Sequence, residues 1–366
     1  MTSLDELPIR DDLRGKSPYG APQQTVPVAL NVNENTHPIP EDVAHDIIAR
    51  VAAAILRLNR YPDREFTDLR RSLAEYLGHG LEAEQIWAAN GSNEVLQHVL
   101  QAYGGPGRVA LGFAPTYSMY GLLASGTGTG WITAPRDDEF EVSTETAVRA
   151  VQEHDPDVVL LCAPNNPTGT PLALDTIRAV ADAARGVVVV DEAYFEFAEP
   201  GTPSALTLLD GRPRLLVSRT MSKAFAFAGA RVGYLAGDPA AIDALRLVRL
   251  PYHLSSLTQA AALGALAHSS EMLAMVDEIR GQRERISTEL SRLGFHPYRS
   301  GSNFVLFGGV DEPHAVFEAL LDRGILIREI GIPGHLRVTA GTEPETSAFL
   351  EAIALFAPER PNRIAI

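Results

Sequence analysis

Short apolar runs alternate with helical periodicity between residues 41 and about 255. The run 187–190 consists of valines only, which is typical of a strand covered on both faces. Elsewhere apolar residues recur three and four positions apart, as in Leu69, Leu73 and Leu77 before Gly78, and this spacing predicts a helix that ends there. The alternation predicts an α/β fold, a three-layer sandwich around a mostly parallel sheet. The predicted strands are 86–89, 109–113, 131–133, 158–162, 187–190, 215–217 and 232–235.

The two ends of the chain follow different patterns. The N-terminal region is rich in Pro and Asn and has no clear periodicity, so we expect an arm that lies over other parts of the protein. After Ser255 two long helical patterns precede short strands and a last helix, which predicts a smaller α+β domain. Its predicted helices are 258–270, 271–293 and 344–356, and its predicted strands are 303–307, 325–328 and 336–339. The expected division is an arm (1–40), a large α/β domain (41–255) and a small α+β domain (256–366).

Composition narrows the classes of function. A net charge of −15 disfavours nucleic acids and anionic membranes as partners, because both repel an acidic surface. No apolar run reaches the roughly 18 residues that a membrane span needs, and no signal peptide is visible. The single cysteine, Cys162, excludes an internal disulfide and a cysteine-based metal cluster, so we expect a cytoplasmic protein without a metal site. Of the 31 basic residues only Lys16 and Lys223 are lysines, so chemistry that needs an amine side chain has two candidates.

Polar residues follow one predicted strand after another, where the ligands of open α/β sheets bind. Asp191 comes directly after the valine run, and a carboxylate there needs a cationic or hydrogen-bonding partner, such as a protonated pyridine nitrogen; a turn cap is the alternative. Lys223 lies among small and apolar residues, where a desolvated amine has a lowered pKa and attacks aldehydes; a surface lysine is the alternative. The polar segments are 90–94, 114–117, 165–169, 191–194 and 218–223.

A candidate site for a phosphate group lies in the same segments. Gly91, Ser92 and Asn93 open a helix directly after a strand and offer backbone N–H groups and the positive end of the helix dipole. Taken alone, such a turn is usually a helix cap. Ser222 adds a hydroxyl and Arg231 adds a fork of donors, so together they predict an anion site.

Three motifs with their order and spacing resemble the fold type I pyridoxal-phosphate aminotransferases. They are Asn165-Asn-Pro-Thr-Gly169, Asp191-Glu-Ala-Tyr194, and Ser222-Lys223 with Arg231 downstream, and the resemblance extends from about residue 5 to residue 355. Within that superfamily the chain is similar to the actinobacterial histidinol-phosphate aminotransferases, on the segments 13–22, 60–63, 87–94, 219–225 and 250–255. The resemblance implies a homodimer that uses pyridoxal 5′-phosphate to transfer an amino group between L-histidinol phosphate and 2-oxoglutarate in histidine biosynthesis.

The resemblance also implies roles for individual residues. Lys223 would hold the cofactor as a Schiff base and carry the proton, with Asp191 and Tyr194 as the other catalytic residues. The implied cofactor-binding residues are Ser92, Asn93, Tyr117, Asn166, Asp191, Tyr194, Thr220, Ser222, Lys223, Arg231 and, from the other subunit, Tyr61. The implied substrate-binding residues are Arg337, Tyr19, Asn93, Tyr252 and Asn35.

Two positions and the segment 341–346 depart from the family pattern, and three other functions stay open. Thr36 stands where the family usually has Pro, and Tyr120 stands where close relatives often have His; we expect both near the mouth of the substrate site. The open alternatives are an aminotransferase for aromatic or specialised-metabolite amino acids, a pyridoxal-phosphate decarboxylase, and a ligand-sensing domain without activity. Lys223, Asp191 and Arg231 are all present and no basic extension is visible, which argues against the ligand-sensing domain.

Overall fold

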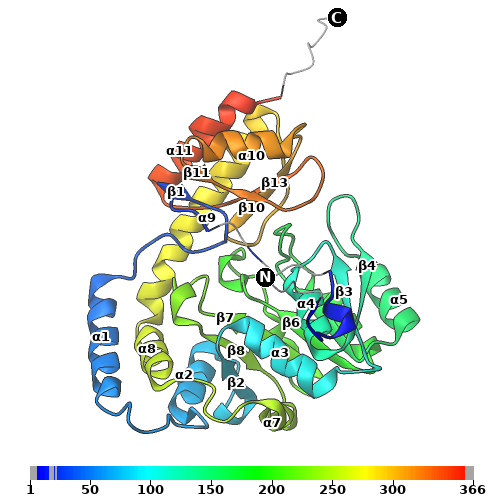
Figure 1. Cartoon of the computed structure of the whole chain (residues 1–366), viewed down its shortest axis with the longest axis vertical. Helices are drawn as coiled ribbons and strands as arrows, with labels where there is room; N and C mark the ends of the chain where they lie inside the picture. Colours follow the sequence, from blue (N-terminus) through cyan, green and yellow to red (C-terminus); the bar gives the residue numbers. More distant parts are fainter. Residues whose placement is uncertain (1–5, 16–19, 21–22, 359–366) are drawn as a thin grey trace, which may run out of the picture.

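A central sheet of seven strands organises the larger part of the molecule in the computed structural model, which describes residues 6–15, 20 and 23–358 (Figure 1). The strands are β2 (Ile86–Ala89), β3 (Val109–Ala114), β4 (Gly130–Pro135), β5 (Val158–Cys162), β6 (Val187–Asp191), β7 (Leu215–Thr220) and β8 (Gly233–Ala236). Their order is β2-β8-β7-β6-β5-β3-β4. Only β8 runs antiparallel to its neighbours, so the prediction of a mostly parallel sheet is confirmed.

Helices cover both faces of this sheet. Every residue of β5, β6 and β7 is buried, which requires cover on each side and explains why β5 and β6 are almost continuously apolar. The helices of this part are α2 (Thr67–Leu77), α3 (Ser92–Tyr103), α4 (Met119–Thr127), α5 (Thr144–His154), α6 (Leu174–Ala183) and α7 (Pro239–Val248). Helix α2 ends at Gly78, whose φ of 68° suits the residue after a helix, as its sequence predicts.

A smaller antiparallel sheet forms the C-terminal part, in the upper half of Figure 1. Its strands have the order β12-β13-β10-β9. They are β9 (His296–Pro297), β10 (Phe304–Gly308), β12 (Arg328–Glu329) and β13 (Leu336–Thr339), and the helices α10 (Pro313–Leu321) and α11 (Glu343–Ile353) belong to the same part. The prediction of a smaller α+β domain is confirmed, although the strand predicted at 325–328 is divided into β11 (Ile325–Leu326) and β12.

The N-terminal segment joins this smaller part before the chain enters the larger one. Strand β1 (Val28–Ala29) pairs in parallel with β11, and the N–H of Thr339 donates to the carbonyl of Leu30. Helix α1 (Glu41–Ile55) then packs against α8 (Ser256–Ala267), and α8 also packs against α2. The exact division at residues 40 and 255 stays a prediction.

Helix α9 (Ser269–Leu293) connects the two parts along its length (Figure 1). The guanidinium of Arg283 on this helix is 1% exposed and donates to the carbonyls of Phe197 (2.8 Å) and Ser302 (3.2 Å). It also forms an ion pair with Glu199 (2.6 Å), so its buried charge is satisfied by groups from both parts. Within the described ranges no helix is long and apolar enough to cross a membrane.

Candidate active site

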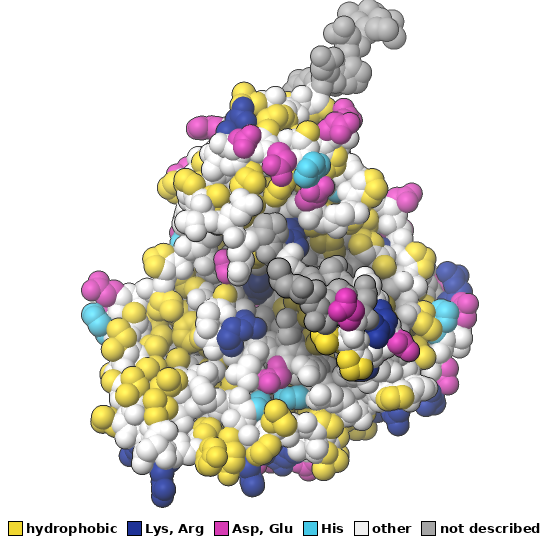
Figure 2. All heavy atoms as spheres, viewed as in Figure 1, with side chains coloured by type: hydrophobic (Ala, Val, Ile, Leu, Met, Phe, Trp, Pro, Cys, Tyr) yellow, Lys and Arg dark blue, Asp and Glu magenta, His cyan; other side chains and the backbone are white. Residues whose placement is uncertain are grey.

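A cavity of about 610 Å³ lies between the two parts, beyond the carboxyl ends of β5, β6 and β7. This is the edge at which open α/β sheets bind their ligands. Figure 2 shows the hollow on this face of the molecule, with basic side chains in it. The predicted site residues that line the cavity are Ser92, Asn93, Tyr117, Asn166, Asp191, Tyr194, Thr220, Ser222, Lys223, Arg231 and Arg337.

Asp191 is the last residue of β6, and 3% of its surface is exposed. Tyr120 donates a hydrogen bond of 2.8 Å to its Oδ2, and Ser218 donates one of 3.1 Å to its Oδ1. Burial raises the pKa of the Asp191 carboxyl, and these two hydroxyl donors act against that shift because they stabilise the ionised form. The cavity therefore has a buried carboxylate that can accept a hydrogen bond from a protonated ring nitrogen.

Lys223 presents a half-buried amine to the same cavity. Its Nζ donates to the carbonyl of Val32 at 3.1 Å and lies 5.8 Å from the centre of the Tyr194 ring. Burial, together with the positive charge of Arg337, lowers the pKa of Lys223 to about 8. A substantial fraction of this amine is therefore neutral near physiological pH, which is the form that attacks an aldehyde.

A cup for a phosphate group forms at the N-terminus of α3. The helix begins at Ser92, after Gly91 at φ 85°, and a Cβ on Gly91 would lie only 2.3 Å from Nη2 of Arg231. Arg231 donates to the hydroxyl of Ser222 (3.3 Å), which also accepts a hydrogen bond from Thr220 (3.0 Å). Backbone N–H groups, a guanidinium and hydroxyls thus converge on one point, as phosphate esters require.

Two tyrosines line the space between this cup and the lysine. Tyr117 donates to Oδ1 of Asn93 at 3.1 Å. The hydroxyl of Tyr194 accepts hydrogen bonds from the amides of Asn33 (3.0 Å) and Asn166 (3.2 Å). Because those two bonds use the acceptor positions of the Tyr194 oxygen, its own proton is left to donate to another group.

Two arginines from the smaller sheet close the other end of the cavity. Arg337 on β13 is 7% exposed and donates to Oδ1 of Asn166 (2.6 Å) and to the carbonyl of Asn31 (3.0 Å). Arg328 on β12 is its direct partner across the strand pair and lines the same cavity. Sequence reasoning missed Arg328, although it ends a predicted strand; only the pairing of β12 with β13 sets it beside Arg337.

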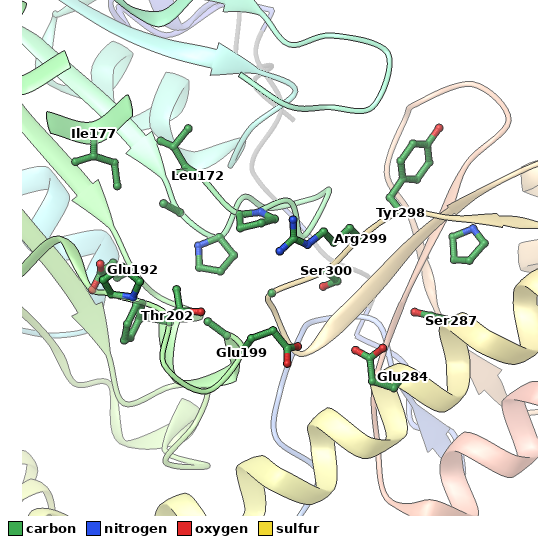
Figure 3. A pocket seen from close by; sticks show the side chains of 18 of the residues that line it. Leu172, Ile177, Glu192, Glu199, Thr202, Glu284, Ser287, Tyr298, Arg299 and Ser300 are labelled. Atoms are coloured by element: carbon green, nitrogen blue, oxygen red, sulfur yellow. The ribbon is translucent and has the colours of Figure 1, made fainter. Parts of the chain in front are cut away.

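A second cavity, of about 460 Å³, lies along the seam between the two parts (Figure 3). Its carboxylates already have partners: Glu192 pairs with Arg219 (2.8 Å), whereas Glu199 and Glu284 both pair with Arg283. Its other walls are largely proline, aliphatic and hydroxyl side chains. Among the described residues that line the seam cavity there is no lysine, and its carboxylates are already paired with arginines. We therefore place the chemistry in the larger cavity.

Residues 25–353 match the family described as aminotransferase class I and II. The chain belongs to this family. The histidinol-phosphate aminotransferase of Paenarthrobacter aurescens is 62% identical over 364 residues, which cover 98% of each chain. That of Thermobifida fusca is 57% identical over 351 residues, or 96% of each chain. The structure also resembles the crystal structure of histidinol-phosphate aminotransferase from Sinorhizobium meliloti in complex with pyridoxal-5′-phosphate, with a TM-score of 0.83, 25% identity and coverage of 91% and 92% of the two chains.

The cavity fits pyridoxal phosphate, the cofactor of class I and II aminotransferases. The cup at Gly91 and Arg231 suits its phosphate, because a side chain on Gly91 would fill the space that the guanidinium occupies. Asp191 can accept a hydrogen bond from its ring nitrogen, and Lys223 can supply the amine for its aldehyde. When bound, the cofactor supplies an electron sink that stabilises negative charge on the substrate carbon.

Several residues that the resemblance assigns to the aminotransferase site lie elsewhere in this single chain. Tyr61 and Tyr252 stack on each other with ring centres 4.6 Å apart and do not line the cavity. Asn35 donates to a backbone carbonyl in the segment after Lys223, whereas Asn33, which we did not predict, lines the cavity. Tyr19 lies outside the described residues.

The expectation that Tyr120 lies near the substrate mouth is wrong. Tyr120 is fully buried beneath Asp191, because positions 120 and 124 form the inner face of α4, where Ala124 is buried as well. Thr36 lies outside the cavity and donates to Oε2 of Glu345 at 2.6 Å. The departure at position 120 therefore concerns the support of Asp191 and not the entrance for substrate.

Lys223→Ala should abolish transamination and the near-visible absorbance of the bound cofactor, and Lys16→Ala should change neither.

In the wild-type protein without cofactor, the rate of pyridoxal-phosphate uptake should rise with pH through about 8, because the neutral form of Lys223 predominates above its pKa. Stopped-flow absorbance measures this rate. If borohydride still trapped cofactor on Lys16 in the Lys223→Ala protein, the assignment of Lys223 as the reactive amine would be contradicted.

Asp191→Asn keeps the shape of the side chain and removes its charge. We expect the turnover rate to fall by roughly 100-fold or more, the range for loss of one preorganised electrostatic contact. The matched control is Asp175→Asn on α6, where the carboxylate is 83% exposed. Steady-state kinetics with both variants test the assignment, and near-normal turnover of Asp191→Asn would refute it.

Proposed function

We propose that this chain transfers the amino group of L-histidinol phosphate to 2-oxoglutarate, giving imidazole-acetol phosphate and glutamate in histidine biosynthesis. Two relatives that are 62% and 57% identical over nearly the full length are named histidinol-phosphate aminotransferase. These names favour this reaction over an aromatic aminotransferase or a decarboxylase. The single cysteine suits a reducing compartment, and we propose the cytoplasm as the location.

The pair Arg328 and Arg337 is the observation in the cavity that supports a phosphorylated substrate. A phosphate monoester carries close to two negative charges near neutral pH, whereas the carboxylate of an ordinary amino acid carries one. Arg337 alone can hold either anion through its fork of donors. Arg328 lies opposite it on β12, and its side chain makes no hydrogen bond or ion pair with the rest of the described chain, so it can supply a second guanidinium to a dianion.

The other residues would orient the reactants and move a proton. The Nζ of Lys223, whose pKa is about 8, can give up and take back a proton at the substrate carbon near neutral pH. Asp191 would hold the ring nitrogen of the cofactor in its protonated form. Tyr194 would donate to the phenolic oxygen of the cofactor, held in place by Asn33 and Asn166.

We also propose that two copies of the chain form a homodimer. Most of the large exposed apolar side chains of the described residues gather on α1, on the segment after it and near the end of α7, and Figure 2 shows many apolar side chains on the lower left of the molecule. They are Ile48, Ile55, Leu56, Leu58, Tyr61, Leu247, Leu250 and Tyr252. An apolar face of this kind is typical of a protein interface. A second copy would bury it and would carry Tyr61 toward the partner's cofactor site, as the family resemblance implies.

The donor preference tests the proposed substrate. Arg328→Gln should lower the catalytic efficiency with histidinol phosphate by roughly 10- to 150-fold, which corresponds to one hydrogen bond between charged groups, and should leave phenylalanine turnover nearly unchanged. Arg323→Gln is the matched control, because Arg323 is exposed outside the cavity. If the wild-type enzyme used phenylalanine as efficiently as histidinol phosphate, the aromatic aminotransferase would become the better proposal.

Sedimentation tests the dimer. The double variant Leu56→Glu and Leu250→Glu places charges on the proposed interface, so it should sediment as a monomer and bind pyridoxal phosphate more weakly. Leu355→Glu is the control, since Leu355 is also exposed (67%) but lies beyond α11 at the C-terminal end. An active wild-type monomer at assay concentration would exclude the dimer, and unchanged cofactor affinity in Tyr61→Phe would exclude the role of Tyr61.

A further inference from the structure

Tyr120 is the one tyrosine whose hydroxyl donates directly to Asp191 among the described residues. It is fully buried near the start of α4, and its hydrogen bond to Oδ2 measures 2.8 Å. Ser218 on β7 donates to Oδ1, so each carboxylate oxygen accepts one hydroxyl. The two hydroxyl donors approach from different elements and fix the plane of the carboxylate, which also accepts from the backbone N–H of Ala193. A carboxylate has about four lone-pair positions, so it can still accept from a group in the cavity.

The Tyr120 ring is held by its aromatic neighbours. Tyr117, which lines the cavity, contacts it edge-on with ring centres 5.4 Å apart and an angle of 88° between planes. Trp131 on β4 lies on another side at 6.3 Å, and Gly112 leaves room for that indole, because a Cβ there would be 2.4 Å from it. Tyr120 thus has little freedom to turn away from Asp191, and it joins that carboxylate to a ring of the cavity wall.

We propose that Tyr120 is a positioning residue that orients Asp191 and stabilises its negative charge through a neutral hydrogen bond. The inference rests on the proposed role of Asp191 toward the ring nitrogen of pyridoxal phosphate. A buried carboxylate without donors is costly and tends to take up a proton. A protonated Asp191 could no longer stabilise a positive ring nitrogen, so the donor at Oδ2 acts on cofactor binding without touching the cofactor.

Tyr120 and two of its titratable neighbours, Cys162 and Arg136, keep the same protonation state near neutral pH. Asp191 faces the Tyr120 hydroxyl from β6, and Cys162 faces it from β5. Arg136, directly after β4, lies within electrostatic reach of Tyr120, and Glu192 acts on Asp191. Burial raises the pKa of Tyr120 well above its ordinary value and that of Cys162 to about 12, and it lowers the pKa of Arg136 to about 10. Tyr120, Cys162 and Arg136 therefore do not change protonation between about pH 6 and 9, whereas a histidine at position 120 would do so.

The test measures pyridoxal-phosphate affinity and the near-visible absorbance of the bound cofactor between pH 5 and 9. Tyr120→Phe keeps the ring and removes the hydroxyl, and we expect the cofactor dissociation constant to rise by roughly 10- to 150-fold, as for loss of one hydrogen bond to a charged group. The matched control is Tyr76→Phe, which removes a hydroxyl that donates to the buried carboxylate of Glu196 (3.3 Å) outside the cavity. This control should keep wild-type affinity.

Tyr120→His provides the second arm. The imidazole restores a donor, so cofactor affinity should recover relative to Tyr120→Phe, and the absorbance should gain a pH-dependent step between about pH 5 and 8 that the wild-type protein lacks. Such a step would not arise if position 120 only filled space. If thermal unfolding shows that Tyr120→Phe is not folded, the pH-dependent step in Tyr120→His tests the inference on its own: its presence supports the hydrogen-bonding role of position 120, and its absence contradicts that role.

Two outcomes would overturn the inference. One is wild-type affinity and absorbance in Tyr120→Phe, and the other is a Tyr120→His protein whose absorbance has no additional step. Asp191→Asn separates this failure from failure of the proposed site. If Asp191→Asn binds the cofactor normally, the role of Asp191 itself is wrong, whereas weak binding by Asp191→Asn with normal binding by Tyr120→Phe removes only the role of Tyr120.

Discussion

The charge of one carboxylate has to be accommodated at the end of a fully buried strand. Asp191 follows four valines in the middle of the seven-stranded sheet, where an ionised group without partners is strongly unfavourable. Hydroxyl groups on β7 and α4 donate hydrogen bonds that stabilise the charge, and the carboxylate also lines the cavity, where a cationic partner can bind. The packing of α4 against the sheet thus affects the properties of Asp191, because it brings the Tyr120 hydroxyl within hydrogen-bond distance of the carboxylate.

The amine opposite this carboxylate depends on the other part of the molecule. Lys223 lies just after β7 of the larger sheet, but the charge of Arg337, on the smaller sheet, helps to lower its pKa. The N-terminal segment connects the two, since Asn31 accepts from Arg337 and Val32 accepts from Lys223. A change in the placement of the smaller sheet would therefore alter both the position of Arg337 in the cavity and the pKa of Lys223.

Much of the fold and the cofactor side of the cavity could be predicted from local sequence. Strands β2 and β5 have the predicted bounds, because an uninterrupted apolar run between turn residues has few other stable arrangements in water. Asp191 was recognisable because it directly follows the valine run, and Lys223 because it lies in the polar segment after a predicted strand. Arg231 was recognisable from its spacing of eight residues after Lys223. Their convergence on one cavity follows from the parallel strands, whose carboxyl ends share one edge.

The sequence by itself determined the alternation of strands and helices, the family and the residues that end each strand. Only the tertiary structure decided the antiparallel direction of β8, the pairing of β1 with β11, and that Asn33, and not Asn35, lines the cavity. It also decided that Tyr120 supports Asp191 and that Arg328 lies beside Arg337. The physical reason is that strand and helix periods are properties of neighbouring residues, whereas these contacts join segments far apart in the chain and depend on which face each element turns inward.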